Sequence, residues 1–440
     1  MTNQFDAVSY YHSLNRFGVQ PGLSRIAALC KALGDPQKAL SCVHVAGTNG
    51  KGSTCTLIAS VLQAAGFRTG LYTSPFVLDF RERIRLNGEM ISYSDLDEVT
   101  WQVRQAILKL NEEGVFPTEF EAVTAAAFLY YKSKKCDVVV LETGLGGRFD
   151  ATNLIETPLL SVITSISFDH TAILGDTIEK IAWEKSGIIK SGIPVVVSRA
   201  QDQTALAVIR KDAYAQNAPL LLSDPTRLLI CKRALTGTDV LYHSALLHCP
   251  FPGSHQTDNL GLALTAIEAL RGKGWHIPTD SIRSGVAAAF IPARTEVLCE
   301  KPLVLLDGAH NPDGLRALVS LIRSFMPNGK LLGIVGMMED KDLASAVQLL
   351  AGVFRDVITV TPTNPRAIPA SRFAELFRRH GVRADARDLP EDAIRTALER
   401  AHEYDGVIVC GSLYLAADVR PILLQSIESI SHSEKGGTQS

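Results

Sequence analysis

The sequence lacks paired cysteines, long apolar runs and a basic, apolar leader at its N-terminus. Its eight cysteines form no C-x-x-C pair and lie scattered along the chain, several of them within apolar segments. This spacing argues against a zinc site or a disulfide framework, so we expect small core residues. No run of about 18 apolar residues is present. Residues 1–18 carry no basic segment followed by an apolar one, and we therefore expect a soluble, cytoplasmic protein.

An excess of charge of one sign is also missing. The chain has 44 Lys and Arg against 46 Asp and Glu, which gives a net charge of -2. Charges this well balanced give no electrostatic reason to expect nucleic acid or an anionic membrane as a partner. Small anions must then be bound by local sites.

The order of apolar segments indicates two α/β domains, because 440 residues exceed what one core usually holds. Short apolar runs ending in polar residues or glycine alternate with segments of helical periodicity, which is typical of parallel sheets covered by helices. In the first half we predict strands at 42–45, 69–72, 137–141, 159–163 and 195–198 and helices at 54–65, 94–111, 120–133 and 177–186. After Pro292 we predict strands at 303–306, 331–335, 357–361 and 406–410 and helices at 313–325, 341–354, 370–380 and 391–404.

From this pattern we predict three regions. Residues 1–294 form a nucleotide-binding domain, and residues 295–425 form a smaller, doubly wound α/β domain. The Pro-containing segment 291–295 is the expected linker between them. Residues 426–440 are mostly polar, and we expect a flexible tail there.

Residues 43–54, VHVAGTNGKGST, predict a strand, a glycine-rich turn and the start of a helix. Glycines let backbone N–H groups approach oxygen atoms that a Cβ would keep away, and the helix start adds the positive end of its dipole. Lys51 supplies a positive charge for terminal phosphates, and the Ser53 hydroxyl is placed for Mg²⁺. The segment is therefore a predicted phosphate-binding loop.

Polar groups follow two further strands where each one ends. Glu142 comes directly after strand 137–141, a position that holds a carboxylate near Mg²⁺ in phosphate-loop enzymes; the alternative is a strand-end Glu that caps a loop. His170 follows strand 159–163 and is a candidate metal or phosphate ligand, although a loop His is more often a plain hydrogen-bonding residue. Lys185 ends a predicted helix, where the pattern alone favours a solvated lysine that complements the dipole.

The loop AGTNGKGS departs from the Walker pattern, because Val45 replaces its first glycine and Gly52 follows the lysine. In this it resembles the folate branch of the Mur ligase superfamily, folylpolyglutamate synthase and dihydrofolate synthase. Further matches follow in chain order at residues 72–75, 141–153, 168–170, 184–185, 253–256 with Asn259, Arg294, 307–312 and 411–414. The resemblance implies a P-loop, Mur-ligase-like ATP-binding domain followed by a Rossmann-like α/β domain.

The resemblance also implies the site residues. ATP would be bound by Gly47, Thr48, Asn49, Gly50, Lys51, Gly52, Ser53, Asn259, Arg294 and Asp307. Two Mg²⁺ ions would be held by Ser53, Ser74, Glu142, His170 and Lys185, with Lys185 carbamylated, and a monovalent cation is a further expected ligand. His310 and Ser412 would line the glutamate side, and the catalytic set would be Lys51, Glu142, His170, Lys185 and His310.

The folate side is implied at Phe120, Arg83 and Asp150. Phe120 has an equally good alternative as a core residue at a helix start. Arg83 alternates with Arg81 and Arg85, a pattern that also fits a solvated strand face. These alternatives stay open at the level of sequence.

The implied reaction is ATP-dependent ligation of L-glutamate to a folate acid through an acyl phosphate, by a monomer with small-molecule substrates. We favour two activities, on dihydropteroate and on tetrahydrofolate, over polyglutamylation alone. The rivals are a Mur-type ligase acting on a nucleotide-linked peptidoglycan precursor and a non-catalytic P-loop ATP-binding switch.

Overall fold

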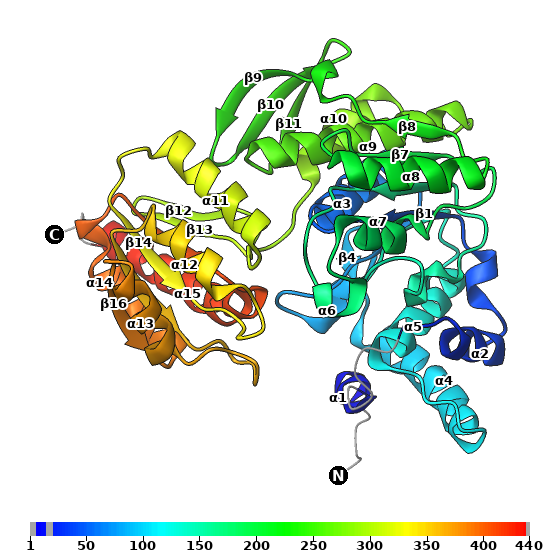
Figure 1. The fold of residues 1–440 in the computed structure, drawn as a ribbon, viewed down its shortest axis with the longest axis horizontal. Helices are drawn as coiled ribbons and strands as arrows, with labels where there is room; N and C mark the ends of the chain where they lie inside the picture. The colour runs from blue at the N-terminus through cyan, green and yellow to red at the C-terminus, as the bar shows by residue number, and fades with distance from the viewer. Residues whose placement is uncertain (1–5, 15–20, 437–440) are drawn as a thin grey trace. The chain divides into compact units, whose positions relative to one another are not determined.

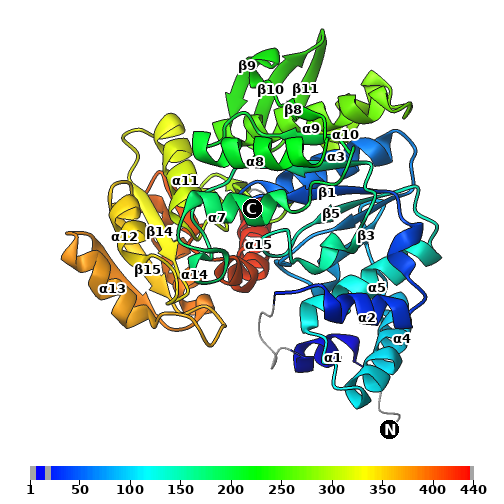
Figure 2. The ribbon, with the colours of Figure 1, turned by 45° about the vertical axis from the view of Figure 1, so that its right-hand side comes forward.

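The computed structural model describes residues 6–14 and 21–436, which form two compact α/β units. Unit 1 holds the described residues up to Cys231 together with Asp239–Pro250 and His255–Phe290. Unit 2 holds the described residues from Ile291 onward, together with the short segments Lys232–Thr238 and Phe251–Ser254. Figures 1 and 2 draw the helices and strands of both units.

The main sheet of unit 1 has eight strands in the order β4-β3-β2-β5-β1-β6-β7-β8. The six strands from β2 to β8 run parallel, and β3 and β4 add antiparallel strands at one edge. Their bounds are β1 Cys42–Ala46, β2 Thr69–Tyr72, β3 Ile84–Leu86, β4 Glu89–Met90, β5 Val138–Glu142, β6 Leu160–Ile163, β7 Val195–Val197 and β8 Leu220–Leu222. A three-stranded sheet follows, with β9 Leu229–Ala234, β10 Gly237–Tyr242 and β11 Ala245–Cys249.

Helices cover both faces of the eight-stranded sheet, and β1, β5 and β6 are therefore buried on both sides. Figure 2 shows α3 on one side of β1 and β5 and α2 and α5 on the other. The helices and short 3₁₀ segments are α1 Ala7–Ser13, α2 Ser24–Ala32, η2 Pro36–Ala39, α3 Lys51–Ala64, η3 Phe80–Arg83, α4 Tyr93–Glu112, α5 Glu119–Ser133, η4 Ala151–Leu154, α6 Thr171–Leu174, α7 Ile178–Ser186, α8 Gln203–Ala215, η5 Pro225–Arg227, α9 Ser254–Gly272 and α10 Thr279–Ala288.

Unit 2 is a six-stranded sheet in the order β12-β13-β17-β14-β15-β16, parallel except for β12. Helices α11, α12 and α13 share one apolar core with the sheet, while α14 packs against α15. The bounds are β12 Glu296–Glu300, β13 Leu303–Leu306, α11 Pro312–Phe325, β14 Leu331–Val335, α12 Leu343–Ala351, β15 Asp356–Val360, α13 Ala370–Arg379, β16 Arg383–Arg387, α14 Pro390–Glu399, η6 Ala401–Glu403, β17 Gly406–Cys410 and α15 Leu413–Gly436. The predicted doubly wound fold is confirmed.

Some elements differ from the sequence-based prediction. Strand β16 carries the sequence RADAR, whose alternating charges fit an edge strand but resemble a loop. The expected helix 391–404 ends at Glu399 and is followed by the 3₁₀ turn η6. Helix α15 continues to Gly436, so most of the expected tail 426–440 is helical, because its Ser and Glu residues do not break a helix. Residues 437–440 lie outside the described residues, and flexibility of the tail stays a prediction.

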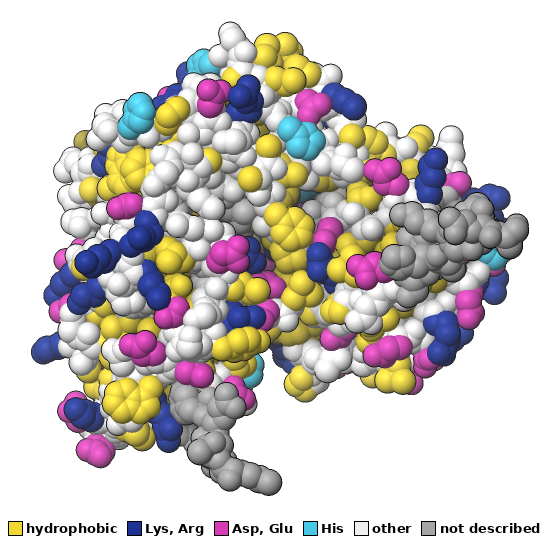
Figure 3. All heavy atoms as spheres, turned by 180° about the vertical axis from the view of Figure 1, so that it is seen from behind, with side chains coloured by type: hydrophobic (Ala, Val, Ile, Leu, Met, Phe, Trp, Pro, Cys, Tyr) yellow, Lys and Arg dark blue, Asp and Glu magenta, His cyan; other side chains and the backbone are white. Residues whose placement is uncertain are grey.

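The surface agrees with the balanced composition. Basic and acidic side chains are interspersed over the face of the molecule drawn in Figure 3. Within the described part of the chain, no helix combines the length and apolar character needed to span a bilayer.

Candidate active site

The predicted phosphate loop joins β1 to α3, and two of its glycines are required by close neighbours. Gly47 and Gly50 have φ angles of 153° and 83°. A Cβ on Gly47 would lie 1.7 Å from Thr164 Oγ1, and one on Gly50 would lie 2.3 Å from Asn259 Oδ1. A side chain at either position would therefore displace the loop. The contact also brings Asn259, on α9, next to the loop.

The loop is fastened to the segment that follows β6. The Thr48 N–H donates to Ser165 O at 2.8 Å, and the Thr48 hydroxyl donates to Ser167 O at 3.1 Å. The Thr164 hydroxyl donates to Asn49 O at 2.7 Å. The loop is thus held in shape by the protein alone, which is the preorganisation that an anion site needs. Sequence reasoning missed this role of residues 164–167, although their run of Ser and Thr was visible.

Three strand ends converge beside Lys51. Its Nζ lies 4.0 Å from Glu142 Oε1, at the end of β5, and donates to Thr48 O at 3.2 Å. The Ser74 N–H, after β2, donates to Glu142 Oε2 at 3.2 Å. Glu142 is only 4 % exposed. The structure therefore places a buried carboxylate, a lysine and the phosphate loop at one edge of the sheet.

Lys185 is buried in the last turn of α7, so the alternative of a solvated helix-end lysine is wrong. Its Nζ donates to Gly47 O at 2.7 Å. Burial, together with the nearby charge of Lys51, lowers the pKa of Lys185 to about 7. A large fraction of the Lys185 side chain is therefore neutral near neutral pH. Its nitrogen is hydrogen-bonded to the backbone of the phosphate loop.

His170 precedes α6 in the left-handed conformation, with φ of 51°. Its side chain is 49% exposed, and Nε2 lies 3.9 Å from Asp169 Oδ1. His170 is therefore open to solvent, unlike Glu142 and Lys185. Among the described residues, no group of three or more His, Cys, Asp and Glu is arranged to hold a metal ion. The predicted Mg²⁺ set combines Glu142 and His170 with two hydroxyls and a modified lysine, so it does not require such a group.

Two of the predicted folate-side residues lie against the turn that follows β5. The buried Asp150 accepts from the Leu145 N–H at 2.8 Å and from the Thr152 N–H and hydroxyl at 3.0 and 2.5 Å. Burial raises the pKa of Asp150. The Phe120 ring crosses Gly144, where a Cβ would lie 2.4 Å from Phe120 Cζ. Both side chains therefore shape the turn 143–147.

Arg83, the third predicted folate-side residue, lies among aromatic and acidic groups. Its Nη1 is 3.5 Å from Glu119 Oε1, and its guanidinium lies 5.2 and 5.0 Å from the ring centres of Phe76 and Phe80. These distances fit cation–π contacts. The alternative of a solvated face is wrong, because the side chains are only 17, 12 and 17% exposed in Arg81, Arg83 and Arg85.

In unit 2, Asp307 fixes the backbone around Arg294. Its carboxylate accepts from the Thr295 N–H at 2.7 Å, the Thr295 hydroxyl at 2.9 Å and the Ala309 N–H at 2.8 Å. Ala293 and Thr295, on either side of Arg294, have left-handed φ angles of 55° and 51°. This conformation is costly for residues with a Cβ and persists only where neighbours enforce it.

The predicted glutamate-side residues follow the neighbouring strands β13 and β17. The Gly411 N–H donates to Ala309 O at 2.9 Å, which joins the two strand ends. His310 Nδ1 lies 2.9 Å from the carbonyl oxygen two residues earlier. Ser412 is buried, and its hydroxyl oxygen accepts from the Tyr414 N–H at 3.0 Å. His310 and Ser412 therefore share the carboxyl edge of the sheet, where α/β folds bind ligands.

This order of domains is that of a Mur ligase. The model of the Mur ligase middle domain matches residues 45–267, and the model of the Mur ligase glutamate ligase domain matches residues 293–413.

Two similar proteins show which family of Mur ligases the chain belongs to. The dihydrofolate synthase/folylpolyglutamate synthase of Bacillus subtilis is 38% identical over 94% of this chain and 98% of the relative. The folylpolyglutamate synthase of Lacticaseibacillus casei is 36% identical over 96% of this chain and 99% of the relative. The chain belongs to the dihydrofolate synthase/folylpolyglutamate synthase family of Mur ligases.

Solved structures of folylpolyglutamate synthases have the same fold as this chain. Mycobacterium tuberculosis folylpolyglutamate synthase, complexed with ADP and AMPPCP, matches with a TM-score of 0.86 and 30% identity, covering 95% of this chain and 99% of that chain. E. coli FolC, in complex with DHPP and ADP, matches with a TM-score of 0.84 and 30% identity, covering 96% of this chain and 98% of that chain. The family resemblance, the fold and the class of ATP-dependent ligase, all predicted from the motifs, are confirmed. The alternative of a non-catalytic ATP-binding switch is thereby set aside.

Proposed function

We propose that this protein joins L-glutamate to folate acids in two reactions, acting on dihydropteroate as a dihydrofolate synthase and on tetrahydrofolate as a folylpolyglutamate synthase. The observation that carries the proposal is the convergence of Lys51, Glu142 and Ser74 at the phosphate loop, in a chain that matches bifunctional relatives over nearly its whole length. A carboxylate does not condense with an amine unaided in water. ATP phosphorylates the carboxylate and so gives an acyl phosphate. The glutamate amine then attacks the acyl carbon, and phosphate is the leaving group.

The phosphate loop binds the triphosphate of ATP in this proposal. Backbone N–H groups at the start of α3 and the charge of Lys51 face the phosphates. Asn259, which lies against Gly50, is assigned to the nucleotide in this proposal. Arg294 and Asp307 are the proposed nucleotide-binding groups of unit 2. Support comes from related folylpolyglutamate synthase structures, which are complexes with ADP and with AMPPCP.

The residues beside the loop fit Mg²⁺, because hydroxyl and carboxylate oxygens are its preferred ligands. Ser53 and Ser74 carry the hydroxyls, and the buried Glu142 carries the carboxylate. When bound, Mg²⁺ neutralises charge on the transferring phosphoryl group. We assign a second ion to His170 and to a carbamate on Lys185, with a monovalent cation nearby.

Lys185 suits such a carbamate for a physical reason. Only a neutral amine combines with CO₂, and burial lowers the pKa of this amine to about 7. The modification replaces a buried cation with oxygen ligands and removes its repulsion with Lys51. A carbonyl signal from ¹³CO₂ that disappears in the Lys185→Ala variant would support the assignment.

The two acids are assigned to separate groups of residues. Asp150, Phe120 and Arg83 bind the folate acid in this proposal. The related E. coli FolC structure is a complex with DHPP and ADP, which supports a second small molecule beside the nucleotide. His310 and Ser412 bind the incoming glutamate. We propose that the protein acts as a monomer on these small molecules.

The experiment offers dihydropteroate and tetrahydrofolate separately to the protein with ATP, Mg²⁺ and L-glutamate, and identifies products by mass. We expect each acid to gain glutamate, with ADP released in step. Product from tetrahydrofolate alone would reject the first activity, and product from neither acid would reject the proposal. Transfer to a nucleotide-linked peptide precursor would support the Mur-type alternative.

A further inference from the structure

His44 is a buried imidazole to which neither the motifs nor the proposed chemistry gives a role. It lies at the centre of β1, paired with Leu141 of β5 and Ser161 of β6, and is 0 % exposed. Burial, with a smaller effect from Lys190, lowers the pKa of His44 to about 3, so the ring is neutral. Burying a polar ring in an apolar strand is unfavourable unless it gains a hydrogen bond. His44 therefore needs a hydrogen-bond partner inside the protein.

His44 begins a chain of three side chains that leads away from the strand. Its Nε2 lies 2.8 Å from Thr152 Oγ1, which in turn lies 2.5 Å from Asp150 Oδ1. A hydroxyl has one proton. When Asp150 is ionised, Thr152 donates that proton to the carboxylate and must accept from His44. This order requires the tautomer with its proton on Nε2.

The other ring nitrogen is consistent with that tautomer. Nδ1 of His44 is buried and has no hydrogen-bond partner among the described residues. A bare acceptor nitrogen costs less to leave unpaired than a buried N–H donor, since buried donors are almost always paired. The unpaired Nδ1 and the short contact at Nε2 therefore point to the same protonation state.

The far end of the chain reaches the turn that follows β5. Asp150 Oδ2 accepts from the Leu145 N–H at 2.8 Å, while Oδ1 is occupied by Thr152. The backbone of Gly144 contacts the same carboxylate. The Asp150 carboxylate therefore holds the start of the turn 143–147, and its direction depends on the Thr152 hydroxyl, which His44 orients.

We propose that His44 is a positioning residue for the folate side of the active site. By donating to Thr152, it fixes the hydroxyl as a donor to Asp150 and so orients the carboxylate and the turn 143–147. The inference rests on the proposed function, in which Asp150 binds the folate acid. His44 itself touches no substrate.

The first test reads the tautomer directly. Nitrogen NMR of the full chain labelled at histidine, with the His44→Gln variant to assign the signal, should show the proton of His44 on Nε2. The Thr152→Val variant should shift that signal, because it removes the acceptor. A proton on Nδ1, or a signal indifferent to Thr152→Val, would overturn the proposal.

The second test separates positioning from mere packing. Thr152→Val and His44→Phe should each raise the KM for dihydropteroate about tenfold, the effect of one lost hydrogen bond, and leave the KM for ATP within about twofold. His44→Gln keeps an N–H donor toward Thr152 and should recover most of the loss. The double variant should be no worse than the more impaired single variant, because both changes break the same chain.

Each kinetic outcome either supports or contradicts the positioning role of His44. An unchanged KM for dihydropteroate in Thr152→Val, or an equal rise for ATP, contradicts the positioning role, and Thr152→Val carries the test if His44→Phe does not fold. Failure of the proposed function is distinguishable, because it appears as absence of product with the wild-type protein. The tautomer result does not depend on turnover.

Discussion

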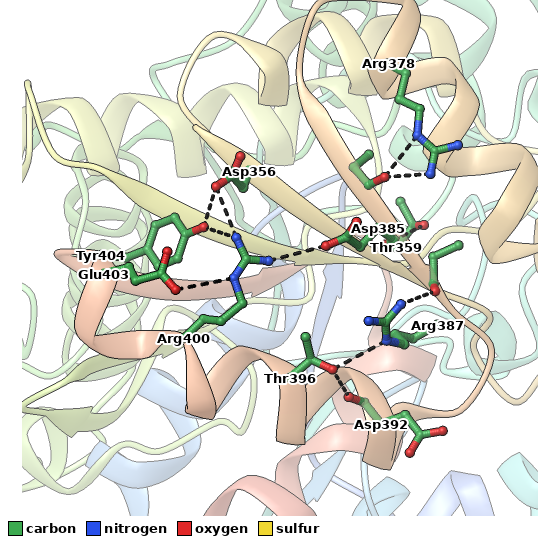
Figure 4. A network of polar contacts seen from close by, with 12 residues as sticks. Asp356, Thr359, Arg378, Asp385, Arg387, Asp392, Thr396, Arg400, Glu403 and Tyr404 are labelled. Carbon is green, nitrogen blue, oxygen red and sulfur yellow. Dashed lines mark hydrogen bonds and ion pairs between the residues drawn. The ribbon is translucent and has the colours of Figure 1, made fainter.

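Two polar networks, one in each unit, each contain a buried aspartate but end in different places. In unit 2, Arg400 lies 3.3 Å from both Asp356 and Asp385, and its guanidinium contacts Tyr404, whose hydroxyl also bonds to Asp356 (Figure 4). Asp356 begins β15, so this part of the network lies at the amino end of a strand. Burial and the bond to Asp356 raise the pKa of Tyr404 to about 12.

In unit 1, the chain from His44 through Thr152 to Asp150 starts in the middle of a strand and leads to a turn at the carboxyl edge. It leaves one nitrogen of His44 unpaired among the described residues. The unit 2 network joins a strand to the end of α14, far along the strands from the edge that carries Ser412. We infer that the first network serves the site and the second serves the fold, as the general placement of ligands in α/β sheets suggests.

The largest expected effect is at the site edge itself. Lys51→Ala should reduce kcat/KM for both glutamate additions by about 10²–10³-fold or more, because it removes the charge that faces the transferring phosphoryl group. The stability should change much less than the activity, because Lys51 Nζ lies as far as 4.0 Å from Glu142 and its removal also relieves the repulsion with the buried Lys185. Activity of Lys51→Ala equal to that of the wild-type protein would show that the carboxyl edge of unit 1 does not carry the chemistry.

The matching change in the unit 2 network should have the opposite profile. Arg400→Met leaves Asp356 buried without its cation and should lower the free energy of unfolding by about 3 kcal/mol. The activity of the protein that remains folded should be unchanged. Urea unfolding and assays at low temperature would measure the two quantities.

Arg395→Met is the control for that variant, because Arg395 lies on the same helix and pairs with Asp392 at the surface. It should have little effect on either stability or activity. Loss of activity in Arg400→Met without loss of stability would remove the distinction between the two networks.

The sequence predicted those parts of the site that have local patterns. The glycines, Lys51 and Glu142 follow from a strand, a turn and a strand end, and each lies where the pattern indicated. The folding of unit 2 into alternating strands and helices followed from periodicity in the same way, apart from the charged edge strand β16.

Residues whose surroundings come from distant parts of the chain were not predictable in this way. A lysine in the last turn of a helix has the same local pattern whether it is solvated or, like Lys185, bonded to a carbonyl 138 positions away. His44 and Thr152 are 108 positions apart, so no local spacing indicates their bond. Such contacts depend on the order of strands in the sheet. The sequence patterns of β1 and β5 alone do not predict that order.

A pH titration separates the two networks further. The pKa of His44 is lowered from 6.5 to about 3 by folding, so the unfolded chain binds a proton before the native protein does. Stability should therefore fall as pH falls below 6.5, by about 2 kcal/mol between pH 7 and pH 5 relative to His44→Gln. Tyr404 does not titrate in this range. Equal pH dependence in the wild type and in His44→Gln would show that His44 is not buried as a neutral ring.

The smallest expected effect tests whether the carboxyl edge of unit 2 also serves the chemistry. Ser412→Ala should raise the KM for L-glutamate about fivefold, as expected for one lost hydrogen bond, and leave the KM for ATP unchanged. Because the Ser412 hydroxyl also accepts from the Tyr414 N–H, a small loss of stability is expected too. Ser412→Thr, which keeps the hydroxyl, is the matched control and should retain the bond to the backbone. An equal rise of the KM for ATP in Ser412→Ala would show that Ser412 acts on nucleotide binding and not on glutamate binding alone. The carboxyl edge of unit 2 would then have a different role from the one proposed.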